Sequence, residues 1–173
     1  MLKTATPNIS VHFWNLSEYV SGRHVGDWID LDSCEDFDEF RSKVGEVTRN
    51  AEEFILSDYE SDCGISFGEL TSLETVWEAH EFLTDLPEYE RDAFSDYLAN
   101  VGGVEYLSAA ISEFPDRYRG QWKSLEDFAI DFGAEVYSEF FKNVPPGFTV
   151  EVDVVSFEQD FWISDNGHVF WRH

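Results

Sequence analysis

The sequence predicts an α+β protein made of three small domains. Apolar residues alternate with a period of two near both ends of the chain, as in strands, and recur with a period of 3.6 through the middle, as in helices. Gly and Pro separate these stretches. We therefore expect a β-β-α-β N-terminal unit (residues 1–67), a central helical bundle (68–114) and a C-terminal α+β unit that ends in a β-hairpin (115–173). With 173 residues, 43% of them hydrophobic, the chain can bury a core.

The N-terminal domain is predicted from alternating segments and one helical stripe. Ser33 is a suitable N-cap for a helix over residues 34–48, whose buried stripe would consist of Phe37, Phe40 and Val44. The strands are expected at residues 9–14, 25–31 and 54–56.

The central domain is predicted to contain three helices. Thr71 would cap the first, with Glu74 completing a capping box. Pro87 fits the first turn of the second helix, which would stop at Gly102, and the third would cover residues 104–111. The positions expected to face the core are Leu70, Leu73, Trp77, His80, Tyr89, Ala93, Phe94, Tyr97 and Leu98.

The C-terminal domain should combine one helix with strands. Ser124 would cap a helix that runs to about residue 140 and ends at the Pro-Pro-Gly of residues 145–147. Residues 148–155 are rich in β-branched side chains and alternate, which favours a strand. Asn166-Gly167 lies between two aromatic segments and predicts a hairpin with a type I′ turn.

The charge of the chain restricts its partners. Asp and Glu number 36 against 11 Lys and Arg, a formal net charge of -25, while 17% aromatic residues argue against a disordered acidic tail. A folded protein with this charge is repelled by nucleic acid and by anionic membranes, so neither is expected as a partner. Its natural partners are basic surfaces, and proteins that bind DNA or RNA provide the commonest ones.

The expected location is the cytoplasm of a cell, in soluble form. No stretch approaches the roughly 20 apolar residues of a membrane span, and no apolar segment typical of a signal peptide follows Met1. Cys34 and Cys63 form no C-x-x-C pair and are too few for a disulfide framework.

Recognisable catalytic and metal-binding motifs are absent from the sequence. Asp30-Leu31-Asp32 begins like a calcium loop, but Glu35 and Arg41 stand where an EF-hand needs Gly and Glu. The five histidines lack ligand spacing, and no P-loop, G-x-S-x-G or G-x-G-x-x-G occurs. We expect no cofactor, no metal and no enzymatic activity, and we expect His80 to be a core or boundary residue.

The acidic residues of the central domain are ordered along helix faces. Between residues 68 and 114 the only base is Arg91. Glu74, Glu78 and Glu81 recur at helical spacing, and so do Glu88, Asp92 and Asp96; like charges at such spacing destabilise a helix by a few tenths of a kcal/mol per pair. The residues expected to form an acidic binding surface are Glu74, Glu78, Glu81, Asp85, Glu88, Asp92, Asp96, Asp27, Asp30, Asp32, Glu126, Asp127 and Asp131.

Such rows have the spacing of nucleic acid phosphates. Four helical residues rise about 6 Å, and two base steps along one DNA strand rise about 6.8 Å. At one charge per ~1.7 Å of duplex axis, the net charge of the chain matches about 43 Å of DNA. Mimicry of DNA is one interpretation of the rows. An ordinary solvated or salt-adapted acidic surface, an acidic module that sequesters another basic protein, and a hydrolase with a carboxyl pair about 5–9 Å apart in a cleft stay open.

Several short stretches also recur, in the same order, in one known family. They are Val25-Gly26-Asp27-Trp28-Ile29, residues 53–60, residues 73–77, Leu86-Pro87-Glu88, and Asn166-Gly167-His168-Val169-Phe170. In these stretches, which span nearly the whole chain, the sequence resembles the ArdA-type antirestriction proteins.

The resemblance implies an elongated, curved, usually dimeric protein of three small domains, encoded on mobile genetic elements. Its acidic surface would mimic bent B-form DNA and occupy the DNA groove of type I restriction–modification enzymes. The family's antirestriction motif, associated with dimer contact, falls here on residues 144–155, where the family is more leucine-rich and helical. Gln159-Asp160 stands where an Arg-Asp pair is frequent. The dimer contacts implied by this position are Val144, Pro145, Phe148, Val150 and Val152.

Overall fold

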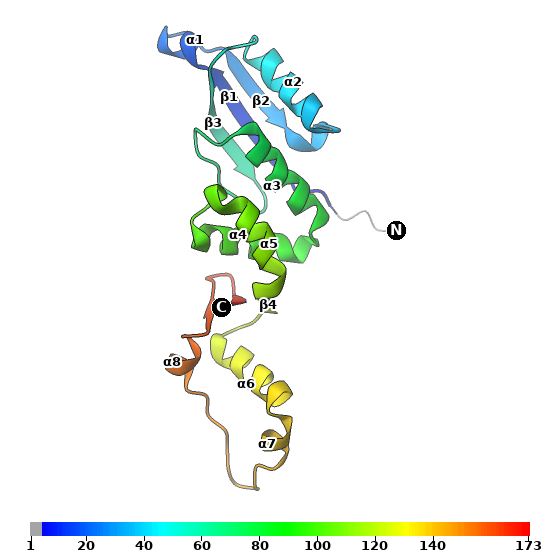
Figure 1. Ribbon diagram of the computed structural model, residues 1–173, viewed down its shortest axis with the longest axis vertical. Helices are drawn as coiled ribbons and strands as arrows, with labels where there is room; N and C mark the ends of the chain where they lie inside the picture. The colour runs from blue at the N-terminus through cyan, green and yellow to red at the C-terminus, as the bar shows by residue number, and fades with distance from the viewer. Residues whose placement is uncertain (1–4) are drawn as a thin grey trace. The chain divides into compact units, whose positions relative to one another are not determined.

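The computed structural model describes residues 5–173, and these residues form the mixed α+β fold that the sequence predicts (Figure 1). In chain order the elements are β1 (Ile9–Asn15), α1 (Leu16–Val20), β2 (Gly26–Asp30), the 3-10 helix η1 (Leu31–Ser33), α2 (Phe37–Val47), β3 (Phe54–Ser61), α3 (Leu73–Asp85), α4 (Glu88–Val101), η2 (Val104–Tyr106), α5 (Leu107–Arg117), β4 (Tyr118–Gln121), α6 (Leu125–Val136), α7 (Ser138–Lys142), α8 (Val154–Phe157), β5 (Phe161–Ile163) and β6 (His168–Trp171).

The chain divides into two compact units, the first ending at Ile111 and the second covering Ser112–His173. Each is described by itself below. The division into three domains, with a first boundary near residue 67, stays a prediction.

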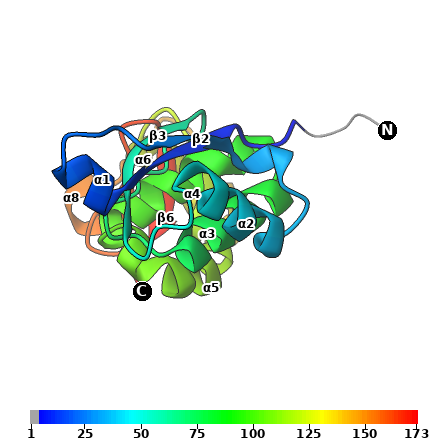
Figure 2. The same cartoon turned by 90° about the horizontal axis from the view of Figure 1, so that it is seen from above.

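The first unit is built on an antiparallel sheet with strand order β2-β1-β3. Alternate side chains of β1, among them Ile9, Val11 and Phe13, are fully buried, whereas the residues between them are partly exposed. Helix α2 covers the buried face of the sheet (Figure 2). There the rings of Phe13 and Phe40 lie 6.2 Å apart. The ring of Phe40 also stacks on Trp77, 5.8 Å away, so that α2 and α3 pack through one aromatic contact.

The sequence placed the start of α2 too early. The N-cap is Asp36, not Ser33: its carboxylate accepts the Glu39 N–H at 2.8 Å, and the Glu39 carboxylate accepts the Glu35 N–H at 2.7 Å. The arrangement differs from a capping box in that Glu39 reaches the N–H one residue before the N-cap, but it too satisfies two N–H groups at once. Ser33 ends the preceding 3-10 turn instead. The short helix α1 was missed altogether; Asn15 caps it.

The start of α3 is also shifted by one residue. Ser72, not Thr71, is the N-cap, because its hydroxyl accepts the Thr75 N–H at 3.1 Å. Thr71 accepts the Gly68 N–H within the preceding loop. Leu70 therefore lies outside the helix and is 92% exposed, against the prediction that it faces the core.

Helix α4 follows the prediction at its C-terminus and in most of its core positions. Gly102 ends it at a positive φ of 121°, and Ala93, Phe94, Tyr97 and Leu98 are buried. Tyr89 is the exception, since 73% of it is exposed. Arg91 takes the buried position instead.

Helix α5 continues through Pro115 to Arg117, beyond the end predicted at residue 111. Proline in a helix costs a hydrogen bond. Burial of the preceding Phe114 offsets that cost, because its ring stacks on Tyr118 at 5.2 Å and also meets Phe170.

The second unit contains an antiparallel sheet of order β4-β6-β5, and the predicted hairpin joins β5 to β6. The turn is not type I′. The carbonyl oxygen of Ser164 accepts the Gly167 N–H at 2.9 Å, and the Ser164 N–H donates to the carbonyl oxygen of His168 at 2.8 Å. The loop between these two residues therefore has three residues, 165–167. Only Gly167 in this loop has positive φ, 84°. This is the pattern of a type I turn followed by a glycine bulge.

The single predicted C-terminal helix is two helices, α6 and α7, divided at Tyr137. The strand predicted over residues 148–155 is not formed: residues 148–153 have no regular structure and α8 follows. The alternation still sorts side chains, since Val150, Val152 and Val154 are half-buried and their neighbours are exposed. An alternating segment becomes a strand only where another strand pairs with it.

Candidate functional site

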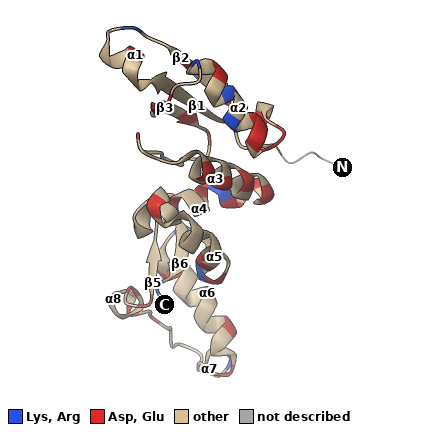
Figure 3. Cartoon of the chain, turned by 45° about the horizontal axis from the view of Figure 1, so that its top comes forward, with Lys and Arg blue, Asp and Glu red and all other residues tan. Residues whose placement is uncertain are grey.

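Helix α3 presents a continuous acidic face. Its exposed residues are Glu74, Glu78, Glu81 and Asp85, and every other residue of the helix is buried or half-buried. The spacing of i, i+4, i+7 and i+11 places these carboxylates on one face, over about 16 Å of helix. The opposite face, with Val76, Ala79 and Leu83, packs into the core. Figure 3 shows the acidic colouring along α3.

Helix α4 extends this acidic character. Glu88 and Asp92 are exposed, and Asp96 is half-buried. Arg91, the one base of the central segment, is only 4% exposed. Its guanidinium donates to Leu83 O at 2.8 Å and to Ala5 O at 2.5 Å, which ties α4 to the last turn of α3 and to the N-terminal segment. The surface of α3 and α4 therefore displays carboxylates without a neighbouring cation of their own helices.

Several bases elsewhere are engaged with other acids or with backbone. Arg23 pairs with Glu18, Arg41 with Asp38, and Lys142 with Glu139. Further pairs are Lys43–Glu39, Arg117–Glu113 and His173–Asp160. Within residues 5–173, none of the exposed acids predicted for the binding surface takes part in such a pair. Their charge is available to a partner.

The predicted acids of the N-terminal part are exposed but have local roles. Asp27 accepts the N–H of Trp28, Asp30 accepts the N–H of Asp32, and Asp32 accepts the hydroxyl of Thr6 at 2.7 Å. These bonds stabilise turns next to β2 and η1. In the second unit the predicted acids lie exposed on α6, two of them in its first turn, where carboxylates favour the positive end of the helix dipole. They are Glu126, Asp127 and Asp131.

One recess in the first unit brings acids of two segments together. We call it the α3 recess; its volume is about 450 Å³, and it is lined by Asp32, Cys34, Glu35, Trp77, His80, Glu81, Thr84 and Asp85. The predicted acidic surface included three of these carboxylates, Asp32, Glu81 and Asp85, but not Glu35, and nothing in the spacing indicated that η1 and α3 converge.

His80 is buried in this recess, as the sequence predicts for a core or boundary histidine, with 6% of its surface exposed. Its Nδ1 has no hydrogen-bond partner among the described residues. Burial lowers the pKa of His80 below its usual value, and the charges of Asp32, Asp30 and Glu81 oppose that shift. The imidazole is therefore neutral at pH 7.

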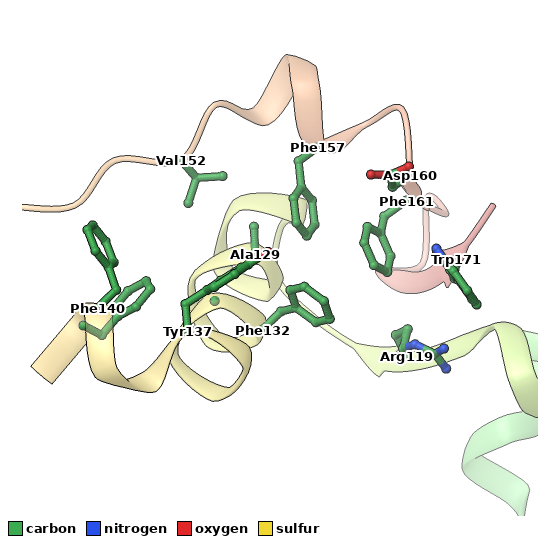
Figure 4. A pocket seen from close by; sticks show the side chains of 12 residues that line it. Arg119, Ala129, Phe132, Tyr137, Phe140, Val152, Phe157, Asp160, Phe161 and Trp171 are labelled. Carbon is green, nitrogen blue, oxygen red and sulfur yellow. The ribbon is translucent and has the colours of Figure 1, made fainter. Parts of the chain in front are cut away.

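The second unit contains an apolar cavity of about 660 Å³ (Figure 4). Rings of α6, α7 and the C-terminal hairpin surround it, and Val152 contributes from the segment predicted as a dimer contact. The lining residues are Arg119, Ala129, Phe132, Gly133, Tyr137, Phe140, Phe141, Val152, Phe157, Asp160, Phe161 and Trp171.

The predicted dimer contacts are partly accessible. Phe148 is 71% exposed and Pro145 is exposed, while Val144, Val150 and Val152 are half-buried. Tyr137 and Phe140, which the sequence analysis did not select for this purpose, expose more than half of their surfaces nearby in the chain. Together they make the second unit more apolar on its surface than the acidic composition suggests.

Residues 5–173 contain no group of three His, Cys, Asp or Glu side chains that could hold a metal ion. Cys34 and Cys63 are buried free thiols. Burial raises the pKa of both thiols. No helix in the same range is long and apolar enough to cross a membrane.

These features define a class: a folded α+β protein whose exposed helical carboxylates are free to meet a basic partner. Comparison with known families identifies the chain more closely. The model of the antirestriction protein family ArdA matches residues 12–172, so the chain belongs to this family. It is a non-enzymatic antirestriction protein that mimics DNA and inhibits type I restriction–modification enzymes. A search among curated proteins gave no significant match.

Proposed function

We propose that the exposed carboxylates of α3 and α4 form the central part of the DNA-mimicking surface, and that the methyltransferase core of the type I enzyme is what they bind. The observation that supports this is the composition of α3, whose exposed positions are all acidic and form no ion pair within the described chain. Lys and Arg that hold DNA phosphates would meet these carboxylates instead, and counterions would be released as they are from DNA.

The acids of the N-terminal part and of α6 would add further charges to the binding of the enzyme. They are Asp27, Asp30, Asp32, Glu126, Asp127 and Asp131. Because the energy of such binding is spread over many charges, one Asp→Asn or Glu→Gln change should weaken inhibition only slightly. Complete loss of inhibition from a single such change would contradict the proposal.

The experiment that tests the proposal is competition for DNA. A labelled duplex carrying the recognition site is bound to a purified type I methyltransferase core and titrated with the protein at two salt concentrations. We expect stoichiometric displacement that weakens as salt rises. Lack of displacement from enzymes of several type I families would refute the proposal and would favour an acidic module for another basic protein.

We also propose that the protein is a homodimer in which the second unit forms the contact. The exposed apolar side chains of this unit support the proposal, Phe148 and Phe140 above all. A dimer would cover them, and exposed apolar patches are typical of interfaces. Sedimentation of the wild type and of Phe148→Asp over a range of concentrations tests it: the wild type should dimerise and the variant should not. A wild type that stays monomeric at every concentration would exclude the dimer.

A cytoplasmic location follows from the proposed target, because restriction enzymes act on DNA inside the cell. Cell fractionation with an antibody to the protein would test it, and recovery of the protein outside the cytoplasmic fraction would contradict it.

A further inference from the structure

We propose that the α3 recess is a socket for one arginine side chain of the target enzyme. The proposal rests on the proposed function and deepens it. The exposed rows of α3 and α4 would give long-range, distributed attraction, whereas the recess would hold one guanidinium group in a fixed position and so set the register of the complex.

The charges of the recess call for a cation. Asp32 and Glu35 approach from the segment between β2 and α2, and Glu81 and Asp85 approach from α3. No ion pair within residues 5–173 involves any of the four. Like charges that converge on one recess repel one another, and a bound cation relieves this repulsion. Because no three ligating groups in the described chain are close enough to share a metal ion, a larger, hydrogen-bonding cation fits better.

His80 provides an independent indication of a ligand. It lines the recess, only 6% of its surface is exposed, and its Nδ1 has no hydrogen-bond partner within the described chain. A buried polar group without a partner costs free energy, so such groups are rare in proteins unless something else satisfies them. In a neutral imidazole Nδ1 can accept a hydrogen bond, so an arginine N–H that reached it from the recess would supply the partner it lacks.

The shape of the site favours arginine over lysine. The ring of Trp77 lies 5.1 Å from that of His80, so that two flat rings line the same recess. A guanidinium is planar, stacks on aromatic faces, and has five donors, which can reach several carboxylates at once. Lysine has a compact, strongly hydrated ammonium group and would use neither the rings nor the spread of acceptors as well.

The test compares two variants that lose the same charge. Glu81→Gln/Asp85→Asn removes two carboxylates of the recess, and Glu88→Gln/Asp92→Asn removes two exposed carboxylates of α4 outside it. Each pair consists of one Glu and one Asp four residues apart, the first pair on α3 and the second on α4. Affinity for a type I methyltransferase core is measured directly at one salt concentration, after melting curves show that both variants are folded.

The proposal expects the recess variant to lose at least about tenfold more affinity than the α4 variant, because breaking a desolvated charge pair costs more than removing one of many screened charges. Equal losses would overturn the socket while leaving DNA mimicry intact. If the wild type itself fails to bind the enzyme, the proposed function fails instead.

A second measurement is independent of the enzyme. The imidazole resonances of His80 are followed by NMR while N-acetyl-arginine amide is added at constant ionic strength, with N-acetyl-lysine amide as the control. We expect a saturable shift of the His80 resonances that is larger for the arginine compound and is reduced in Glu81→Gln/Asp85→Asn. The same response to both compounds, or none, would contradict an arginine socket.

Discussion

The acidic rows make a quantitative prediction about salt. In a variant with Glu74→Gln, Glu78→Gln, Glu88→Gln and Asp92→Asn, four exposed carboxylates outside the α3 recess are neutral, and the substitutions keep the shape of the side chains. For DNA, each phosphate contact contributes about 0.9 to the slope of log K against log salt. If each carboxylate replaces one phosphate, the slope for binding the type I enzyme should become shallower by up to about 3.6.

The assay is direct binding of labelled protein to a methyltransferase core at salt concentrations from about 50 to about 300 mM, the range in which such slopes are measured. A control variant loses four charges as well, but from carboxylates that already pair with a base on the protein. These are Glu18, Asp38, Glu39 and Glu139, paired with Arg23, Arg41, Lys43 and Lys142.

Both variants have the same net charge, so the comparison separates position from total charge. Paired carboxylates hold few counterions, and the control slope should change by less than about 1. Slopes that fall by the same amount in both variants would show that net charge alone governs binding. A row variant with the slope of the wild type would place α3 and α4 outside the interface and refute the reasoning.

Further predictions concern the fold. Phe94→Ala should destabilise the first unit by about 3–5 kcal/mol because Phe94 is fully buried, whereas Tyr89→Ala on the exposed side of α4 should cost less than about 0.5 kcal/mol; chemical denaturation measures both. Gly167→Ala should lower the melting temperature more than Gly147→Ala. Both glycines have positive φ, but of the two only Gly167 would bring a Cβ against a backbone oxygen, that of Trp122 at 2.6 Å. Equal melting temperatures of the two variants would contradict this. Burial lowers the pKa of His80 in the folded state. Its contribution to stability is therefore fully present above the unfolded-state pKa of about 6.5, and it is lost as the pH falls through the lower folded-state pKa. The free energy of unfolding should therefore decrease from pH 7 to 5.5, and less so in His80→Gln; an unchanged pH dependence in that variant would refute the assignment.

Local signals in the sequence were sufficient for most elements of the fold. Buried stripes such as Phe40 and Val44 in α2, and alternation in β1, predicted helices and strands that the structure contains. The first residues of two helices were predicted wrongly because several residues that can cap a helix follow one another. Asp36 caps α2 in place of Ser33, and Ser72 caps α3 in place of Thr71. Which of two adjacent hydroxyl or carboxyl groups caps a helix depends on the direction of the incoming chain, and that direction is tertiary information.

Other errors have the same origin. The residues 148–155 alternate well, but a strand requires a neighbour with free hydrogen-bonding groups, and local sequence does not reveal one. The sequence analysis did not predict the burial of Arg91, because charged residues are seldom buried. Two carbonyl oxygens, of Leu83 and Ala5, make its burial tolerable, and both depend on how α3 and the N-terminal segment meet α4.

The candidate site was predicted one helix at a time. Period 3.6 correctly indicated that Glu74, Glu78 and Glu81 share an exposed face, because that property depends on one helix only. The α3 recess could not be found in this way. Glu35 and His80 are far apart in the sequence, and only the aromatic packing of α2 on α3 brings their segments together.

The carboxylates of this chain fall into two groups, and the distinction bears on why so costly a charge is kept. Asp36 and Asp153 cap helices, and hydrogen bonds lower the pKa of Asp153, so removing these acids would weaken the fold itself. The exposed acids of α3 do not cap the helix: Ser72 caps it, and its buried face provides the packing energy. Their mutual repulsion only opposes folding. The fold does not need this row, because the helix is stabilised by other means. Binding of a basic partner should therefore depend most directly on this part of the surface.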